Sequence, residues 1–283
     1  MQTTLSSASH TVVIGDDQPT RLIGERINPT GRKKLTAALA AGELDILRQE
    51  AIAQVEAGAD ILDINVGAVG VDEVTVLPRV IQIVSEAVDV PISIDTANPA
   101  ALKAALAMYP GKALVNSVNG EERSLQAVLP LVAEYGARVI ALTMDDGGIP
   151  MDDPRKRLAI ARKIVERAES LGIPRENVLI DCLAMAVGTD PQAGKVTLRA
   201  IQMVKEELGV NLTLGASNVS FGLPDRETVN RAWLPMLIAA GVNCPIINVA
   251  KVRDVILAAD LLVGRDEYAG NYIRFFRSRQ VVA

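Results

Sequence analysis

Histidine is nearly absent from this sequence of 283 residues: His10 is the only one, and it lies in the N-terminal segment. This absence excludes a Ser-His-Asp triad in the body of the chain. It also excludes a zinc site built on several histidines. Any chemistry must therefore use carboxylates, amides, hydroxyls, lysine or arginine.

Cysteine, basic runs and long apolar runs are also scarce. Cys182 and Cys244 lie far apart, which excludes a disulfide framework and an all-cysteine metal cluster, and a reduced, cytoplasmic setting fits. We expect no resident metal. No apolar run reaches the ~18 residues of a membrane span, and residues 1–19 lack the apolar middle of a signal peptide. The net charge of -5, without a basic run, argues against nucleic acid as a partner.

Aromatic residues make up only 3% of the chain, although 49% is hydrophobic. Ala, Val, Ile and Leu therefore form the core, and this aliphatic bias suits a parallel sheet buried on both faces. The length is compatible with one domain, because α/β barrels often extend to ~250 residues as a single unit.

Short β-rich segments alternate with longer helical patterns. Strands are predicted at 21–27, 60–66, 91–95, 113–117, 138–143, 178–181, 211–216 and 244–248. Helices are predicted at 43–57, 72–88, 99–108, 121–135, 153–171, 192–208, 226–240 and 252–263. Right-handed crossovers make such strands parallel, and eight of them predict a single-domain α/β (β/α)8 TIM barrel. We expect an N-terminal extension at 1–20 and the barrel at 21–283.

An open doubly wound sheet is the competing architecture for a chain of alternating strands and helices. It usually has a GxGxxG turn after its first strand. The first predicted strand continues instead as Gly24-Glu25-Arg26, so the sequence favours the closed barrel.

Nearly every predicted strand ends on Asp or Asn, at the end of a TIM barrel where active sites lie. The same residues are favoured as helix N-caps and in turns. Asp95, Asn116 and Asp181 directly follow apolar strand residues, which favours side chains that point into the barrel mouth. Such carboxylates and amides suit the recognition of a flat heterocycle with N–H donors and N or O acceptors.

Seven motifs at these strand ends resemble those of the pterin-binding methyltransferases, which move a methyl group from methyltetrahydrofolate to the cobalt of a corrinoid protein. The resemblance begins near Arg21 and covers nearly the whole chain. Its motifs are Gly24-Glu25-Arg26-Ile27-Asn28, Asp63-Ile64-Asn65-Val66-Gly67, Ile94-Asp95-Thr96, Val115-Asn116-Ser117, Leu142-Thr143-Met144, Ile180-Asp181 and Gly215-Ala216-Ser217-Asn218-Val219-Ser220.

The resemblance implies a pterin site formed by several strand ends. Asp95, Asn116 and Asp181 are expected to hold the amino-pyrimidinone edge of the pterin. Asp63 and Asn65 are expected to line the floor of the pocket.

The resemblance also implies roles for residues around the seventh strand. Asn218 is expected to be the catalytic residue, because it would hydrogen-bond near N5, the nitrogen that carries the methyl group. Ser220 and Arg226 are expected among the substrate-binding residues, with Arg226 positioning the folate.

The implied cofactors are methyltetrahydrofolate or tetrahydrofolate as substrate and cobalamin as methyl acceptor. The segment after Val263 is too short to hold cobalamin, and a DxHxxG cobalamin motif cannot occur with His10 as the only histidine. We therefore expect the corrinoid on a separate partner protein that docks over the barrel mouth. The resemblance also implies a homodimer.

Two other functions were weighed. Dihydropteroate synthase would place an Arg-Lys pair where this sequence has the uncharged Asn218-Val219, and Lys251-Val252-Arg253 is only a partial match to its Arg-x-His. A non-catalytic pterin-binding barrel is the second alternative, and the intact set of polar strand ends argues against it.

Overall fold

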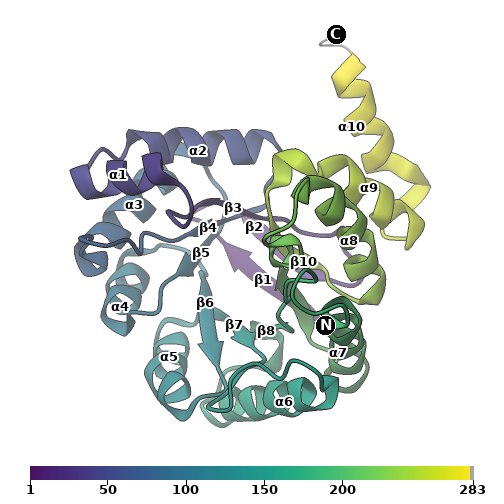
Figure 1. Ribbon diagram of the computed structural model, residues 1–283. Helices are drawn as coiled ribbons and strands as arrows, with labels where there is room; N and C mark the ends of the chain where they lie inside the picture. The colour runs from purple at the N-terminus through teal and green to yellow at the C-terminus, as the bar shows by residue number, and fades with distance from the viewer. Residues whose placement is uncertain (281–283) are drawn as a thin grey trace.

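The computed structural model describes residues 1–280, so positions 281–283 of the predicted barrel domain lie outside the described residues. Eight parallel strands close into a barrel in the order β10-β3-β4-β5-β6-β7-β8-β9 (Figure 1), which confirms the predicted (β/α)8 fold. The strands are β3 (Ile23–Ile27), β4 (Ile61–Ile64), β5 (Ile92–Asp95), β6 (Leu114–Asn119), β7 (Arg138–Leu142), β8 (Val178–Asp181), β9 (Asn211–Gly215) and β10 (Cys244–Ile247).

Helices surround the barrel, and the last of them, α10, extends away from this ring (Figure 1). Their bounds are α1 (Lys33–Ala41), α2 (Asp45–Glu56), α3 (Glu73–Ala87), α4 (Pro99–Met108), α5 (Glu122–Tyr135), α6 (Pro154–Ser170), α7 (Ala193–Leu208), α8 (Arg226–Ala240), α9 (Arg253–Leu262) and α10 (Gly270–Gln280). Local chemistry fixes several ends: Asn98 caps α4 before Pro99, and Gly136 and Gly209 end α5 and α7 in the left-handed conformation. No helix within residues 1–280 has the length and apolar character needed to cross a membrane.

Three elements were not among those predicted: α1, α10 and an N-terminal hairpin. The hairpin pairs β1 (Gln2–Ser6) with β2 (Thr11–Gly15), so the predicted extension at 1–20 is largely an ordered element. Leu5, Val12 and Ile14 are buried against the inward-facing apolar residues of the barrel strands. The hairpin therefore closes the N-terminal end of the barrel, opposite the mouth.

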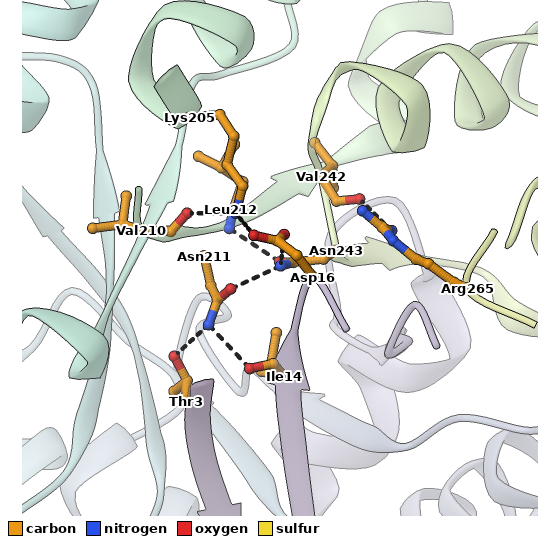
Figure 2. Close-up of polar contacts among 10 residues, drawn as sticks. All are labelled: Thr3, Ile14, Asp16, Lys205, Val210, Asn211, Leu212, Val242, Asn243 and Arg265. Atoms are coloured by element: carbon orange, nitrogen blue, oxygen red, sulfur yellow. Dashed lines mark hydrogen bonds and ion pairs between the residues drawn. The ribbon is translucent and has the colours of Figure 1, made fainter. Parts of the chain in front are cut away.

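Polar contacts fix the hairpin to the strands β9 and β10 (Figure 2). The Asn211 amide donates to the Thr3 hydroxyl at 2.9 Å and to the Ile14 carbonyl at 3.0 Å. Asn243 donates to Asn211 at 2.8 Å and to Asp16 at 3.1 Å, and Lys205 pairs with Asp16 at 2.6 Å. Because Asn211 is fully buried, these bonds satisfy polar groups that would otherwise be costly to bury.

Inward-facing side chains change from apolar to polar along the barrel axis. Ile23, Ile61, Leu114 and Leu179 belong to the inner apolar cluster that packs on the hairpin. Side chains two residues apart on a strand point the same way. The next inward positions are therefore Glu25, Asp63, Asn116 and Asp181, which places a polar layer at the mouth.

Candidate active site

Asp63, Asp95 and Asn116 form one hydrogen-bonded group at the ends of β4, β5 and β6. Oδ1 of Asp63 accepts from the Ser93 hydroxyl at 2.6 Å and from the Asn116 amide at 3.1 Å. The strand register pairs Asp95 with Asn116 directly, and the Asn65 side chain hydrogen-bonds to Asp95. The predicted neighbours thus come together, with Asp63 beneath the more exposed Asp95.

The carboxyls of Asp63 and Asp95 share a hydrogen bond, which requires a proton between them. Burial, followed by the charge of Asp95, raises the pKa of Asp63 well above its ordinary value. Burial also raises the pKa of Asp95, while the hydrogen bonds from Asn65 and Asp63 oppose that rise. The rise is larger for the more deeply buried Asp63, so the more exposed Asp95 is the better placed of the two to accept N–H groups of a ligand.

Asp181 is buried at the end of β8 and is held by backbone donors. Oδ1 accepts from the Leu183 N–H at 2.6 Å, and Oδ2 accepts from the Gly215 N–H at 3.2 Å. Burial raises the pKa of Asp181 to about 6, although these bonds and the positive charge of Arg157 oppose the rise. The carboxyl is mainly ionised at neutral pH, and each oxygen retains a lone pair for a ligand.

A buried arginine holds the loop that supplies the Leu183 donor. Nη1 of Arg157 donates to the carbonyls of Cys182 at 2.6 Å and Leu183 at 2.9 Å, and Leu183 has a positive φ of 60°. Arg157 thereby fixes the loop against Asp181 without itself pointing to solvent.

Asn218 lies in the 3₁₀ turn Ala216–Ser220 that follows β9. It is exposed, and its side-chain amide makes no hydrogen bond within residues 1–280. An amide that is free to donate and accept fits the role that the sequence predicts for it, contact with a ring nitrogen.

Ser220 and Arg226 brace this turn. The buried Ser220 hydroxyl donates to the Ser217 carbonyl at 3.1 Å and accepts from Nε of Arg226 at 3.0 Å. Nη2 of Arg226 donates to the same Ser217 carbonyl at 2.7 Å. Both residues were predicted to bind substrate, and the structure gives them internal partners through which they hold Asn218 in place.

Glu25 is the inward carboxyl that the predicted site set omitted. It lies at the Asn218 side of the mouth, where it accepts from the Ser217 hydroxyl at 2.6 Å. Strand alternation could have identified it. Glu25 lies two residues after Ile23, whose side chain faces inward, and side chains two residues apart on a strand point the same way.

Other polar residues near the strand ends form turns or cap helices, which is the second role that the sequence allows for Asp and Asn at these positions. Asn98 caps α4, Asn119 accepts from the Glu121 N–H at 2.9 Å, and Asp145 accepts from the Gly147 N–H at 2.9 Å. The side chains of the polar layer point inward from a strand, whereas Asn98, Asn119 and Asp145 lie at the last residue of a strand or after it.

A cleft of about 450 Å³ opens over the ends of β5 and β6. It includes Asp95 and Asn116 but neither Asp181 nor Asn218. Its lining also contains Thr96, Ser117, Asn119 and Arg123, together with apolar residues of α4 and α5. Among residues 1–280, no group of three His, Cys, Asp or Glu side chains is arranged to hold a metal ion.

A closed (β/α)8 barrel with polar side chains at its mouth is shared by many enzyme families, so the family is identified from the sequence. The sequence pattern of the pterin binding enzymes matches residues 24–248, and the chain belongs to that family. The chain is 31% identical over 269 residues to the Methylcorrinoid:tetrahydrofolate methyltransferase of Eubacterium limosum, across 92% of this chain and 97% of that protein. It is also 31% identical over 261 residues to the Methionine synthase of Mycobacterium tuberculosis, across 88% of this chain and 22% of that protein.

Solved structures of dihydropteroate synthases share the fold. The Yersinia pestis enzyme superposes with a TM-score of 0.72 at 19% identity, across 93% of this chain and 100% of that one. The Xanthomonas albilineans enzyme in complex with 7,8-dihydropteroate gives 0.65 at 23% identity, across 92% of this chain and 98% of that one. At this identity the likeness establishes the barrel architecture alone.

Proposed function

We propose that this protein transfers a methyl group between N5 of tetrahydrofolate and the cobalt of a corrinoid. The observation that carries the proposal is the match with the Methylcorrinoid:tetrahydrofolate methyltransferase along nearly the full length of both chains. The proposal covers both directions, since the methylated cobalt that one direction produces is the methyl donor of the other.

The polar ring supports recognition of the pterin. The ionised Asp181 accepts two N–H groups from the guanidine-like edge, a charge-assisted contact of the strong kind. Asp95 and Asn116 accept from and donate to the remaining ring atoms, and the buried Asp63 with Asn65 fixes their orientation. Ser220 and Arg226 act by positioning Asn218.

The chemical difficulty is the departure of the methyl group from a poor leaving group. A tertiary amine leaves readily only when N5 gains a proton, while the low-valent cobalt supplies the electron pair that captures the methyl. The Asn218 amide hydrogen-bonds to N5 and strengthens this contact as charge develops there. Stabilisation confined to the transition state raises the rate of the chemical step.

The corrinoid is carried by a separate protein that docks on the barrel mouth. We expect Asp145, Asp146, Met151 and the Phe221–Asp225 loop to rim the mouth, and the Phe221 side chain is 70% exposed. A homodimer and a cytoplasmic location stay predictions from the family resemblance and the composition.

The test is methyl transfer to free reduced cobalamin. Purified protein with methyltetrahydrofolate and reduced cobalamin should give the visible spectrum of methylcobalamin at a rate proportional to protein concentration. The same protein with a pterin pyrophosphate and p-aminobenzoate should form no dihydropteroate. Formation of dihydropteroate without methyl transfer would overturn the proposal.

A further inference from the structure

Glu25 is placed next to the reacting end of the proposed site. Its carboxyl points inward from β3, is partly buried, and accepts from the Ser217 hydroxyl at 2.6 Å. Ser217 is the residue directly before Asn218, in the turn that Arg226 and Ser220 brace. A single hydroxyl therefore connects this carboxyl to the turn that presents Asn218.

The groups around Glu25 come from several elements. The Ser217 hydroxyl lies on the turn after β9, Arg26 on β3, Arg226 on α8, and a backbone hydrogen bond comes from Asn248 after β10. On the neighbouring strand β4 the inward carboxyl is Asp63, which is engaged with Ser93 and Asn116. Glu25 is thus the inward carboxyl that contacts the Asn218 turn.

We propose that Glu25 supplies, through the Ser217 hydroxyl, the proton that N5 retains when the methyl group leaves. This inference rests on the proposed methyl transfer. With Glu25 protonated, the Ser217 hydroxyl turns from Glu25 toward N5, gives its proton to N5 and accepts the proton of Glu25, whose carboxylate is then reprotonated from solvent. The proton bonds to the lone pair of N5. The bond between the methyl carbon and N5 then breaks, and its electron pair stays on N5 as the new lone pair. The methyl group bonds to cobalt with the electron pair of the cobalt.

The electrostatics of the pocket agree with this role. Burial raises the pKa of Glu25, while the Ser217 hydrogen bond and then the charges of Arg226 and Arg26 oppose the rise. A glutamate with a raised pKa holds its proton closer to neutral pH, where a general acid is most effective. Asp181 is unsuited to this role because it is mainly ionised at neutral pH and is assigned to the opposite task, accepting the N–H groups of the pterin edge.

Two substitutions at Glu25 separate proton supply from positioning. Glu25→Gln keeps an oxygen that accepts from Ser217 but cannot release a proton, whereas Glu25→Ala loses both functions. We expect Glu25→Gln to lower single-turnover methyl transfer about 10²-fold, in the range of general acid catalysis, and to abolish the decline of the rate with rising pH. Folate affinity, measured by calorimetry, should stay close to that of the wild type.

Two further variants complete the experiment. Ser217→Ala should show the same loss of rate, because it interrupts the path from Glu25. Glu169→Gln, a matched control at a carboxylate that pairs with Arg175 away from the barrel mouth, should keep the wild-type pH profile. A Glu25→Gln variant with the wild-type rate and pH profile, beside an impaired Glu25→Ala, would assign Glu25 a purely structural role and overturn the proposal.

A second readout separates this inference from the proposed function. Bound folate should shield Glu25 further from water and so raise its pKa. Wild-type protein should therefore take up more protons on binding tetrahydrofolate than Glu25→Gln does. Calorimetry in buffers of different ionisation enthalpy measures this difference. If the difference in proton uptake is observed but no methyl group is transferred, only the proposed transferase activity is contradicted. Equal proton uptake contradicts the role of Glu25, and absence of folate binding contradicts both.

Discussion

At the scale of single residues, Asp181 shows the conflict between stability and binding most clearly. Its carboxyl is buried, its pKa is raised to about 6, and two backbone N–H groups are directed at it. Because the folded-state pKa exceeds the ordinary value near 3.9, burying the charge costs stability once the carboxyl ionises. Under the proposed function, the same charge makes the residue a strong acceptor for the pterin edge.

Asp181→Asn should therefore have opposite effects on folding and binding. In the wild type, the folded state binds the proton more tightly, so stability falls as pH rises from about 4 to about 6, by on the order of 2–3 kcal/mol. The variant should lose this pH dependence. Urea unfolding at pH 4.5 and pH 7.5 tests this, and an equal pH dependence in both proteins would contradict it.

The pH dependence of folate affinity is a separate prediction for Asp181. Wild-type affinity should rise as pH increases through about 6, because binding needs the ionised carboxyl. In Asp181→Asn the affinity should be weaker by roughly 1.5–3 kcal/mol at pH 7.5, the range for a hydrogen bond to a charged group, and nearly constant with pH. Calorimetric titration with tetrahydrofolate measures both, and a wild-type affinity that falls over this range would exclude the assigned role.

Strand alternation predicts much of the site at this scale. Asp95, Asn116 and Asp181 follow apolar strand residues, and the structure places all three inward at the mouth. The internal role of Ser220 was not predictable, because it lies in a 3₁₀ turn whose side-chain directions depend on packing with α8.

At the scale of elements, the N-terminal hairpin has a specific structural role. It buries Leu5 and Ile14 in the end of the barrel opposite the site and hydrogen-bonds to β9 through Asn211. The sequence signal for this hairpin is weak, because its strands are only five residues long, the first is mostly polar, and no Asn-Gly turn joins them. The eight βα units were predictable because long periodic patterns and clear caps define them.

Truncating the hairpin side chain Leu5 should destabilise the protein. Leu5 is fully buried, so Leu5→Ala should lower the free energy of unfolding by about 2–5 kcal/mol. Leu262→Ala is the matched control, since that side chain is 84% exposed and its loss should change stability by less than about 0.5 kcal/mol. Urea denaturation followed by circular dichroism measures both, and equal effects would show that the hairpin does not contribute to the core.

At the scale of the whole molecule, the site is assembled from strands that span the entire barrel. Glu25 lies on β3, Asp95 on β5, Asp181 on β8, and Asn218 after β9. A ligand that contacts all of these strand ends binds only the folded barrel, so binding is coupled to global stability.

Methyltetrahydrofolate should consequently raise the melting temperature of the whole protein. At about 100 times its Kd, a ligand that binds only the folded state contributes about 2.7 kcal/mol. Asp181→Ala should show a much smaller shift at the same concentration. Differential scanning calorimetry measures this, and equal shifts in the two proteins would place the ligand elsewhere.

The most direct test of the account is single-turnover methyl transfer by the wild type and by Asn218→Ala, with folate binding measured in parallel. The account predicts that wild-type protein methylates reduced cobalamin. It also predicts that Asn218→Ala does so about 10²–10³-fold more slowly while its folate affinity changes little, as expected when one transition-state contact is removed. An Asn218→Ala variant that transfers the methyl group at the wild-type rate would contradict the account.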